Sequence, residues 1–428
     1  MTSGAGSRME VFSGRILFLL VLLVSFFAFY TMDSIKVELQ IPHFPRGDCS
    51  LLPHDEFWIR SNRIVTPQGV ISGIVEIKGG RIASVASINR KGGVAPAGKH
   101  VADYGDAVVM PGLIDVHAHL DEPGRSEWEG FSSGTKAAAA GGITTLIDMP
   151  LNSFPSTVSE ETLRLKVEAA EEKIYVDVGF WGGLVPENAF NRSALENLLN
   201  SGALGLKEGL YTLARYKRPL LVHAELVPNS KSNFETRNGA SDPRSYSTYL
   251  ETRPASWEEA AIKELQTAMV ETKAGGPAEG ARVHIVHLSD ARISLDLIKD
   301  AKSTGSSVSV ETCPHYLAFS AEEIREGDTR FKCAPPIRDE GNRQKLWEAL
   351  LDGHIDLLSS DHSPSIPDLK LFEEGDFLRA WGGISSLQFV LPATWSSGMK
   401  HGITLNQLVQ WWSERPAKLA GLEHKVSQ

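Results

Sequence analysis

Short apolar segments alternate with amphipathic segments along most of the chain, and this alternation constrains the fold more than any other feature. Eight apolar segments read as strands: VVMPGLIDVHAHL, TTLIDMP, KIYVDVGFWGGL, ALGLK, PLLVHAE, RVHIVHLS, SVSVETCPHY and IDLLSSDHSP. Apolar residues spaced three and four apart predict helices over 159–173, 258–273 and 290–302. Eight strands, each followed by a helix, predict a (β/α)8 barrel, whose active site lies at the C-terminal ends of the strands.

A smaller sheet precedes the predicted barrel. Residues 57–88 alternate apolar and polar side chains, with glycine-containing turns between the runs, which predicts a small antiparallel sheet. We therefore expect a targeting segment and tether over 1–55, a small β-sheet domain over 56–108, the barrel over 109–422 and a tail over 423–428.

The N-terminal segment has the character of a targeting signal. Residues 16–30 are almost entirely apolar and follow Arg8 and Arg15, as a hydrophobic region follows a basic one in a signal peptide. We expect entry into the secretory pathway, with the endoplasmic reticulum as the location. Because the apolar run is shorter than the roughly 20 residues of a typical span, cleavage of a signal and anchoring in a membrane through 16–30 both stay open.

The charge balance argues against a nucleic acid partner, and the cysteine spacing argues against disulfide bonds or a metal site made of cysteines. The chain of 428 residues holds 43 Lys and Arg against 53 Asp and Glu, a net charge of −10, so we expect no nucleic acid partner. Cys49, Cys313 and Cys333 are too widely spaced for a disulfide framework or a cysteine metal site. Any metal ion must therefore be held by histidine and carboxylate side chains.

Such side chains stand at the ends of the predicted strands. His117 and His119 close the first barrel strand, and the period of two points both rings to one face of that strand. His223, His287 and Asp361 end three later strands. Because the strand ends meet at one mouth of a barrel, we expect these groups to hold zinc or a similar divalent ion.

Other polar residues near the strand ends have simpler interpretations. His284 lies three residues before His287, and we expect it to pack one layer deeper or to support a ligand. His315 and His362 are expected to support the ligands or to face substrate. Glu127 and Glu129 are expected in a solvated first helical turn.

The motifs as a group resemble a known family. DVHAHLDEPGRSEWEGF, GALGLK, LLVHAE, RPASWEEAAI, VHIVHLSDA, ETCPHYL, KCAPPIRD and SSDHSP, in this order, resemble the cyclic amidohydrolases, most closely the plant-type allantoinases. The resemblance implies a two-metal centre bridged by a carbamylated lysine, formed with carbon dioxide. The matching positions are His117, His119, Lys207, His223, His287 and Asp361. Zinc is the expected metal, with manganese, cobalt and iron as alternatives.

The resemblance also implies a reaction. A hydroxide activated by two metal ions would open a cyclic amide, with Asp361 acting as general base and then as general acid. Dihydroorotases carry an arginine where this chain has Asp121, which disfavours a carboxylated ring. We therefore expect allantoin to be opened to allantoate, a step of purine catabolism, with Asp121, Thr312 and Ser363 contacting the substrate.

Two departures from the family pattern keep alternatives open. Lys207 is followed at once by EGLYTLARYK, where the family has a longer loop, and the chain ends at EHKVSQ, so we expect a small sheet truncated at its C-terminal side. The alternatives are another cyclic amidohydrolase, such as a dihydropyrimidinase or hydantoinase, and a catalytically impaired splice-type variant. A homo-oligomer is compatible with each of these.

Overall fold

The computed structural model describes residues 55–89, 94–95, 97–206, 210–227 and 242–426. The predicted targeting segment 16–30 and the predicted bridging ligand Lys207 both lie outside these ranges. Almost all of the described chain belongs to one compact unit, Trp58–Gln428. Within the described residues, no helix combines the length and the apolar character needed to cross a bilayer.

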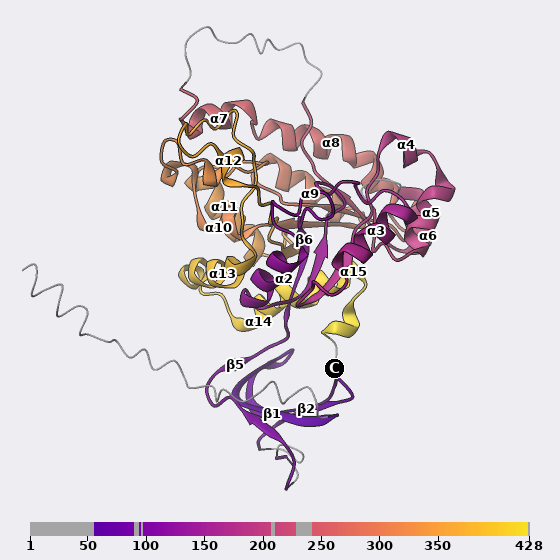
Figure 1. Ribbon diagram of the computed structural model, residues 1–428, viewed down its shortest axis with the longest axis vertical. Helices are drawn as coiled ribbons and strands as arrows, with labels where there is room; N and C mark the ends of the chain where they lie inside the picture. The colour runs from indigo at the N-terminus through magenta and orange to yellow at the C-terminus, as the bar shows by residue number, and fades with distance from the viewer. Residues whose placement is uncertain (1–54, 90–93, 96, 207–209, 228–241, 427–428) are drawn as a thin grey trace, which may run out of the picture. The chain divides into compact units, whose positions relative to one another are not determined.

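The small sheet forms where the sequence predicts it, but it is mixed rather than antiparallel (Figure 1). Its strands are β1 (Glu56–Thr66), β2 (Gly69–Lys78), β3 (Arg81–Ser87), β4 (Val101–Asp103) and β5 (Val108–Val109). The order is β3-β2-β1-β4, β2 and β3 are antiparallel, and both β4 and β5 pair with β1 in parallel. The sequence pattern missed β4, because a strand of three residues shows no periodicity. It assigned Val108–Val109 to the first barrel strand, whereas these residues form β5 and pair with β1.

Seven parallel strands form the core of the larger part of the fold. One sheet has the order β6-β7-β8 and the other has the order β12-β11-β10-β9. Their bounds are β6 Leu113–Ala118, β7 Ile143–Asp148, β8 Asp177–Phe180, β9 Pro219–Val222, β10 Arg282–Ile285, β11 Val308–Thr312 and β12 Leu357–Leu358. Every residue of β6 and β11 is buried, as expected for strands with helices on one side and the packed interior on the other.

Single backbone bridges lie between the two sheets in place of a continuous ring. Leu206 bridges Gly182 on one side and Leu220 on the other, and Ala118 bridges His362. The ALGLK segment, expected as the fourth barrel strand, contributes this one bridged residue next to 207–209, which are not described. The parallel strands and their order agree with a (β/α)8 arrangement, whereas a closed eight-stranded barrel is not formed by the described residues.

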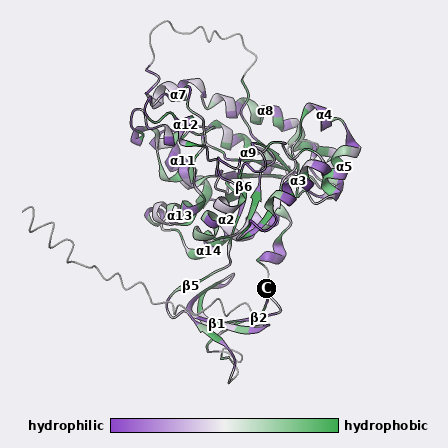
Figure 2. Cartoon of the chain, viewed as in Figure 1, coloured by the Kyte–Doolittle hydropathy of each residue, from purple (hydrophilic) through white to green (hydrophobic). Residues whose placement is uncertain are grey.

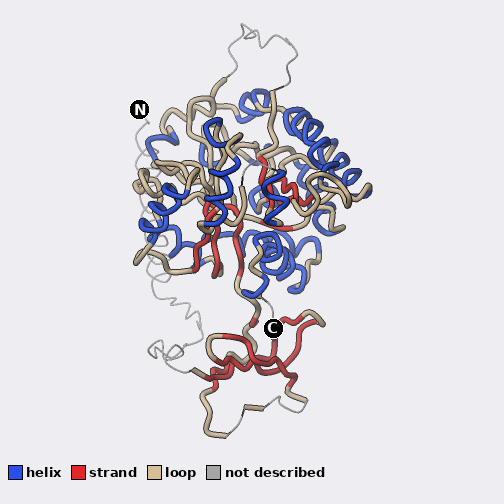
Figure 3. Tube along the Cα trace, turned by 90° about the vertical axis from the view of Figure 1, so that its right-hand side faces the viewer, coloured by secondary structure: helices blue, strands red, loops and turns tan. Residues whose placement is uncertain are grey.

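Helices surround these strands (Figure 3). The α-helices are α2 Phe131–Ala140, α3 Glu160–Ala170, α4 Pro186–Ala189, α5 Arg192–Asn200, α6 Leu210–Tyr216, α7 Tyr246–Thr252, α8 Ser256–Glu271, α9 Ile293–Ser303, α10 Pro314–Ala318, α11 Glu340–Leu351, α12 Pro367–Lys370, α13 Val390–Gly398, α14 Leu405–Val409 and α15 Arg415–Ala420. Helices α3, α8 and α9 confirm the three predicted from apolar spacing, with ends shifted by a few residues.

Short helical turns complete the connections: η1 Ala321–Glu323, η2 Thr329–Phe331, η3 Leu387–Phe389, η4 Met399–His401, the π-helical turn η5 Gln410–Glu414 and η6 Glu423–Lys425. Figure 2 shows hydrophobic colouring along β6 and mixed colouring on helices such as α3 and α5. The start of α3 is capped by Ser159, whose Oγ accepts a hydrogen bond from the Thr162 backbone N–H at 3.2 Å.

Candidate metal centre

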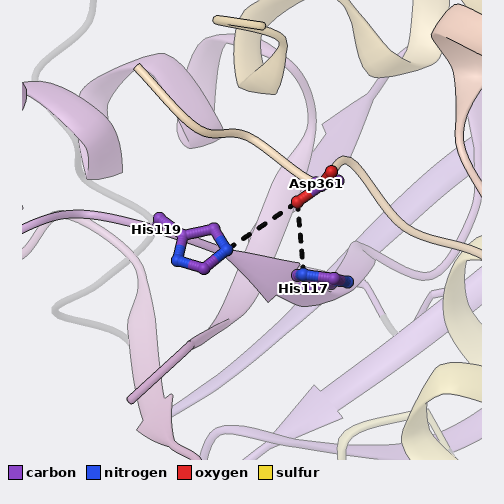
Figure 4. A group of neighbouring side chains, drawn as sticks. All are labelled: His117, His119 and Asp361. Atoms are coloured by element: carbon purple, nitrogen blue, oxygen red, sulfur yellow. Dashed lines mark ion pairs between the residues drawn. The ribbon is translucent and has the colours of Figure 1, made fainter. Parts of the chain in front are cut away.

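Three predicted ligands meet at the end of the first barrel strand (Figure 4). His117 lies in β6, His119 follows its end, and Asp361 lies three residues after β12. Oδ1 of Asp361 is 3.2 Å from Nε2 of His117 and 3.7 Å from Nε2 of His119. One ligand atom from each of the three residues lies within 4.8 Å of the other two, a spacing that suits a shared metal ion.

The two later histidines form a second contact at the same mouth. Nδ1 of His223 lies 2.8 Å from Nε2 of His287, and the two rings meet edge to face. The ring of His287 is also 5.4 Å from the ring of His117, centroid to centroid. The structure thus brings together all five of the predicted ligands that it describes.

Two of these residues have unusual backbone conformations. The backbone φ is 41° at His287 and 43° at Asp361. These values lie in the left-handed region, which residues other than glycine rarely adopt. His287 lies two residues after β10 and Asp361 three residues after β12, where the chain turns toward the next helix. Such backbone strain persists where the surroundings fix it, and it is often found at functional sites.

Sequence reasoning missed two carboxylates that hold the histidine rings. Oε1 of Glu311, in β11, lies 2.6 Å from Nδ1 of His117, and Oε2 of Glu225, after β9, lies 2.8 Å from Nε2 of His223. A signal for Glu311 was present, because a charged residue in the apolar strand VSVET requires a buried partner. For Glu225 the signal was its position two residues after His223, on the same face of an extended chain.

The buried charges shift one another's proton affinities. Burial alone would raise the pKa of Glu311, but hydrogen bonds and charge from His117 and His284 hold it well below its usual range. Burial would lower the pKa of His117, but the negative charges of Asp361 and Glu311 raise it above its ordinary value. Burial raises the pKa of Asp361, although His117 opposes the shift. The carboxylates of Glu311 and Asp361 therefore stabilise a positive charge next to them. Such a charge can come from a protonated histidine or from a bound cation.

His284 supports the site from the deeper layer, as predicted. Its ring is fully buried, with Nδ1 2.8 Å from Oγ of Ser309 and Nε2 3.0 Å from Oε2 of Glu311. These contacts run from Ser309 through His284 and Glu311 to His117. They fix the position of the Glu311 side chain and stabilise its negative charge.

His362 and His315 occupy different surroundings. Nε2 of His362 is 3.2 Å from Oε2 of Glu129, and Nδ1 accepts a hydrogen bond from the Ser386 backbone N–H. The expectation that Glu129 lies in a solvated helical turn is therefore wrong, because α2 begins only at Phe131 and the Glu129 side chain is pulled inward. Neither ring nitrogen of His315 has a hydrogen-bond partner within the described residues, and burial lowers its pKa to about 3.

A cavity of about 770 Å³ opens beside these groups. The predicted ligands His117, His119, His223, His287 and Asp361 line it, as does the proposed substrate contact Ser363. The opposite walls are lined by Trp181, Tyr249, Arg253, Trp257, Lys332 and Trp381, among others. A space of this size admits a small, flat, polar ring molecule.

The other two proposed substrate contacts are buried and do not line the cavity. Asp121 is 1% exposed, with φ 64°, and burial together with the charge of Asp148 raises its pKa to about 8. Thr312 is fully buried and donates a hydrogen bond to the Leu288 carbonyl at 2.8 Å. Neither residue lines the cavity.

Comparison with known proteins decides the family. Residues 52–107 match the model of the composite domain of allantoinase, and residues 108–428 match the model of the amidohydrolase family. The chain is 67% identical to a probable allantoinase of Oryza sativa subsp. japonica, over 88% of this chain and 78% of that one. It is 62% identical to an allantoinase of Arabidopsis thaliana, over 96% and 83% of the two chains. The chain belongs to the allantoinase family.

Solved structures show the fold that allantoinase-family chains share with other cyclic amidases. The L-hydantoinase (dihydropyrimidinase) of Arthrobacter aurescens superposes with a TM-score of 0.73 at 26% identity, covering 86% of this chain and 83% of that one. The dihydropyrimidinase of Brevibacillus agri NCHU1002 gives a TM-score of 0.73 at 28% identity, covering 86% and 82%. The much higher identity to allantoinases does not favour the alternative of a hydantoinase or dihydropyrimidinase.

The residues of this allantoinase-family chain fit a divalent metal centre. The donor set consists of imidazole nitrogens and a carboxylate, the ligands that zinc and similar ions prefer. In both His117 and His223, the ring nitrogen that points away from the other candidate ligands contacts a carboxylate, Glu311 or Glu225. Metal-ligating histidines usually make such a contact through their second nitrogen.

Proposed function

We propose that this chain hydrolyses the hydantoin ring of allantoin to give allantoate. The observation that carries the proposal is the convergence of His117, His119, His223, His287 and Asp361 on one cavity, in a chain that is 62–67% identical to allantoinases. Four histidines and one carboxylate at a cavity of this size suit hydrolysis of a small cyclic amide rather than binding alone.

The metal centre that we propose uses these same side chains. His117, His119 and Asp361 would hold one divalent ion and His223 with His287 a second, with a carbamate on Lys207 between them. Zinc is the proposed metal, and manganese, cobalt and iron are alternatives. When bound, such ions lower the pKa of water and polarise a carbonyl group.

Asp361 is placed to move the proton. Its Oδ1 faces both rings of the His117–His119 pair and also accepts a hydrogen bond from Oγ of Ser363 at 3.2 Å. A carboxylate in this position can take a proton from the attacking water and return it to the departing ring nitrogen. Ser363 and the histidines keep the carboxylate oriented toward the cavity.

The cavity walls would orient the substrate. Ser363 lines the cavity and is the proposed contact for a polar group of the ring. Contact of Asp121 or Thr312 with substrate is also proposed, and because both are buried it would require neighbouring residues to move. Trp181 and Trp257 also line the cavity, and aromatic side chains suit packing against a planar ring.

The cellular setting remains a proposal based on residues 16–30. Their apolar character supports entry into the secretory pathway and the endoplasmic reticulum, with signal cleavage or membrane anchoring as the two outcomes. A homo-oligomer is proposed as one form of the protein in solution.

A direct assay tests the proposed function. The full chain, loaded with zinc or manganese in the presence of bicarbonate, is offered allantoin, hydantoin and dihydrouracil separately. We expect allantoate to form from allantoin, and turnover to be faster with allantoin than with the other two rings. His119→Ala should abolish turnover, whereas His424→Ala, at an exposed position, should not. Faster opening of hydantoin would identify a different amidase, and no turnover of any ring by the metal-loaded chain would contradict the proposal.

A further inference from the structure

Glu225 contacts two different functional groups at the wall of the cavity. Its Oε2 lies 2.8 Å from Nε2 of His223 and 2.5 Å from Nη2 of Arg253, while Nε of Arg253 donates to Oε1 at 3.2 Å. The carboxylate is 3% exposed, and the side chains of His223 and Arg253 are each 29% exposed. A nearly buried carboxylate is thus held between a guanidinium fork and a site histidine.

The contact determines which nitrogen of His223 carries the proton. An ionised carboxylate only accepts hydrogen bonds, so Nε2 of His223 must donate to Glu225. With the proton on Nε2, the lone pair of a neutral ring is on Nδ1, the nitrogen that faces His287 at 2.8 Å. A metal ion binds an imidazole only through such a lone pair.

Arg253 supplies a cationic partner for Glu225. Its guanidinium donates to both oxygens of this nearly buried carboxylate, so Glu225 is paired on the protein side as well as with His223. The position of Arg253 is itself fixed, because its carbonyl accepts a hydrogen bond from Arg338 at 2.6 Å and its guanidinium lies 5.7 Å from the Trp257 ring. Glu225 in turn precedes Leu226, whose backbone N–H donates to the Trp257 carbonyl at 3.0 Å.

We propose that Glu225 and Arg253 form a positioning pair that holds His223 in the tautomer and orientation needed to bind a divalent cation. The proposal rests on the proposed metal centre. A second histidine of the site has the same arrangement of contacts. Glu311 lies 2.6 Å from Nδ1 of His117 and is itself contacted by His284. Arg253 lines the cavity, whereas His284 does not. The Glu225–Arg253 pair therefore connects a residue of the cavity wall to the proposed ligand His223.

Metal affinity tests the pair without relying on turnover. Full-length wild type, Glu225→Gln, Arg253→Met and Arg253→Lys are titrated with zinc against a competing chelator, and bound zinc is counted by elemental analysis. We expect Glu225→Gln to bind zinc roughly 10- to 100-fold more weakly, as for other residues that hold a ligating histidine. Arg253→Met should weaken binding by a smaller factor, and Arg253→Lys should recover part of the loss because it keeps the charge. Arg343→Met, which removes an ion pair with Glu323 and Glu340 remote from the cavity, is the matched control and should bind zinc as wild type does.

The outcomes separate this proposal from the proposed function. Unchanged zinc affinity in both Glu225→Gln and Arg253→Met would overturn the positioning role, whatever the activity. A wild type that binds no zinc would overturn it as well. A wild type that binds zinc tightly but leaves allantoin intact would refute the proposed function while the variants still decide the positioning role. Arg253 is partly exposed, so its variants test the pair even if Glu225→Gln fails to fold.

Discussion

Oε1 of Glu311 lies 2.6 Å from Nδ1 of His117, and neither side chain is more than 3% exposed. The carboxylate also contacts His284 on its other side. A buried carboxylate between two histidines can be ionised only while it is paired, because the interior solvates a lone charge poorly. This contact links the stability of the fold to the geometry of the metal site.

Glu311→Gln should therefore damage both properties. The amide nitrogen would face one of the two histidines as a donor, which leaves a buried polar group unpaired and should lower the free energy of unfolding by about 2–4 kcal/mol. We also expect a loss of zinc affinity. Urea denaturation and chelator competition measure the two effects. Wild-type stability in Glu311→Gln would show that the pair is not ionised.

Asp361→Asn should remove most of the activity. An amide cannot take up the proton from water, and general base catalysis contributes about 10²- to 10⁴-fold. We expect a fall in kcat for allantoin of at least that size, with little change in thermal stability. Asp352→Asn, at an exposed position after α11, is the control. A variant that retains normal turnover would assign the proton transfer to another group.

A second buried ion pair supports the loop that follows β6. Nζ of Lys166 lies 2.5 Å from Oδ2 of Asp148, each side chain is 1% exposed, and Oδ1 of Asp148 accepts the Leu120 backbone N–H at 2.7 Å. Lys166→Met leaves the carboxylate buried without its partner, which should cost about 3–5 kcal/mol of stability. Lys263→Met, which breaks an exposed pair with Glu259, should cost less than about 1 kcal/mol. Equal thermal shifts for the two variants would contradict this expectation.

Glu258 predicts a pH dependence of stability. It is buried against Ser289 and Arg338, and burial raises its pKa to about 7 in the folded state, from an ordinary value of 4.5. Between these two values the folded chain binds more protons than the unfolded chain, so this group's contribution to stability is lost as the pH rises toward 7. Urea denaturation at pH 5 and pH 8 should show a fall, by up to about 3 kcal/mol, that is absent in Glu258→Gln. Identical pH dependence in wild type and variant would exclude Glu258 as the source.

Several features of the site could be predicted because they follow the chain locally. His117 lies in β6 and His119 one residue after it. His223, His287 and Asp361 follow β9, β10 and β12 within three residues, so parallel strands bring these groups to one edge. The mixed pairing of the small sheet and the inward contact of Glu129 could not be predicted in this way. Both depend on partners distant in sequence, His362 in the case of Glu129.

The sequence alone predicted the alternation of strands and helices and the five candidate ligands near strand ends. These follow from residue periodicity and from the geometry of parallel strands. Only the tertiary structure decided which carboxylate holds which histidine, that Glu225 is fixed by Arg253, and that Asp121 and Thr312 are buried away from the cavity lining. The physical reason is that a buried charge acquires its role from groups brought to it by folding, and these groups come from strands and loops far apart in the chain.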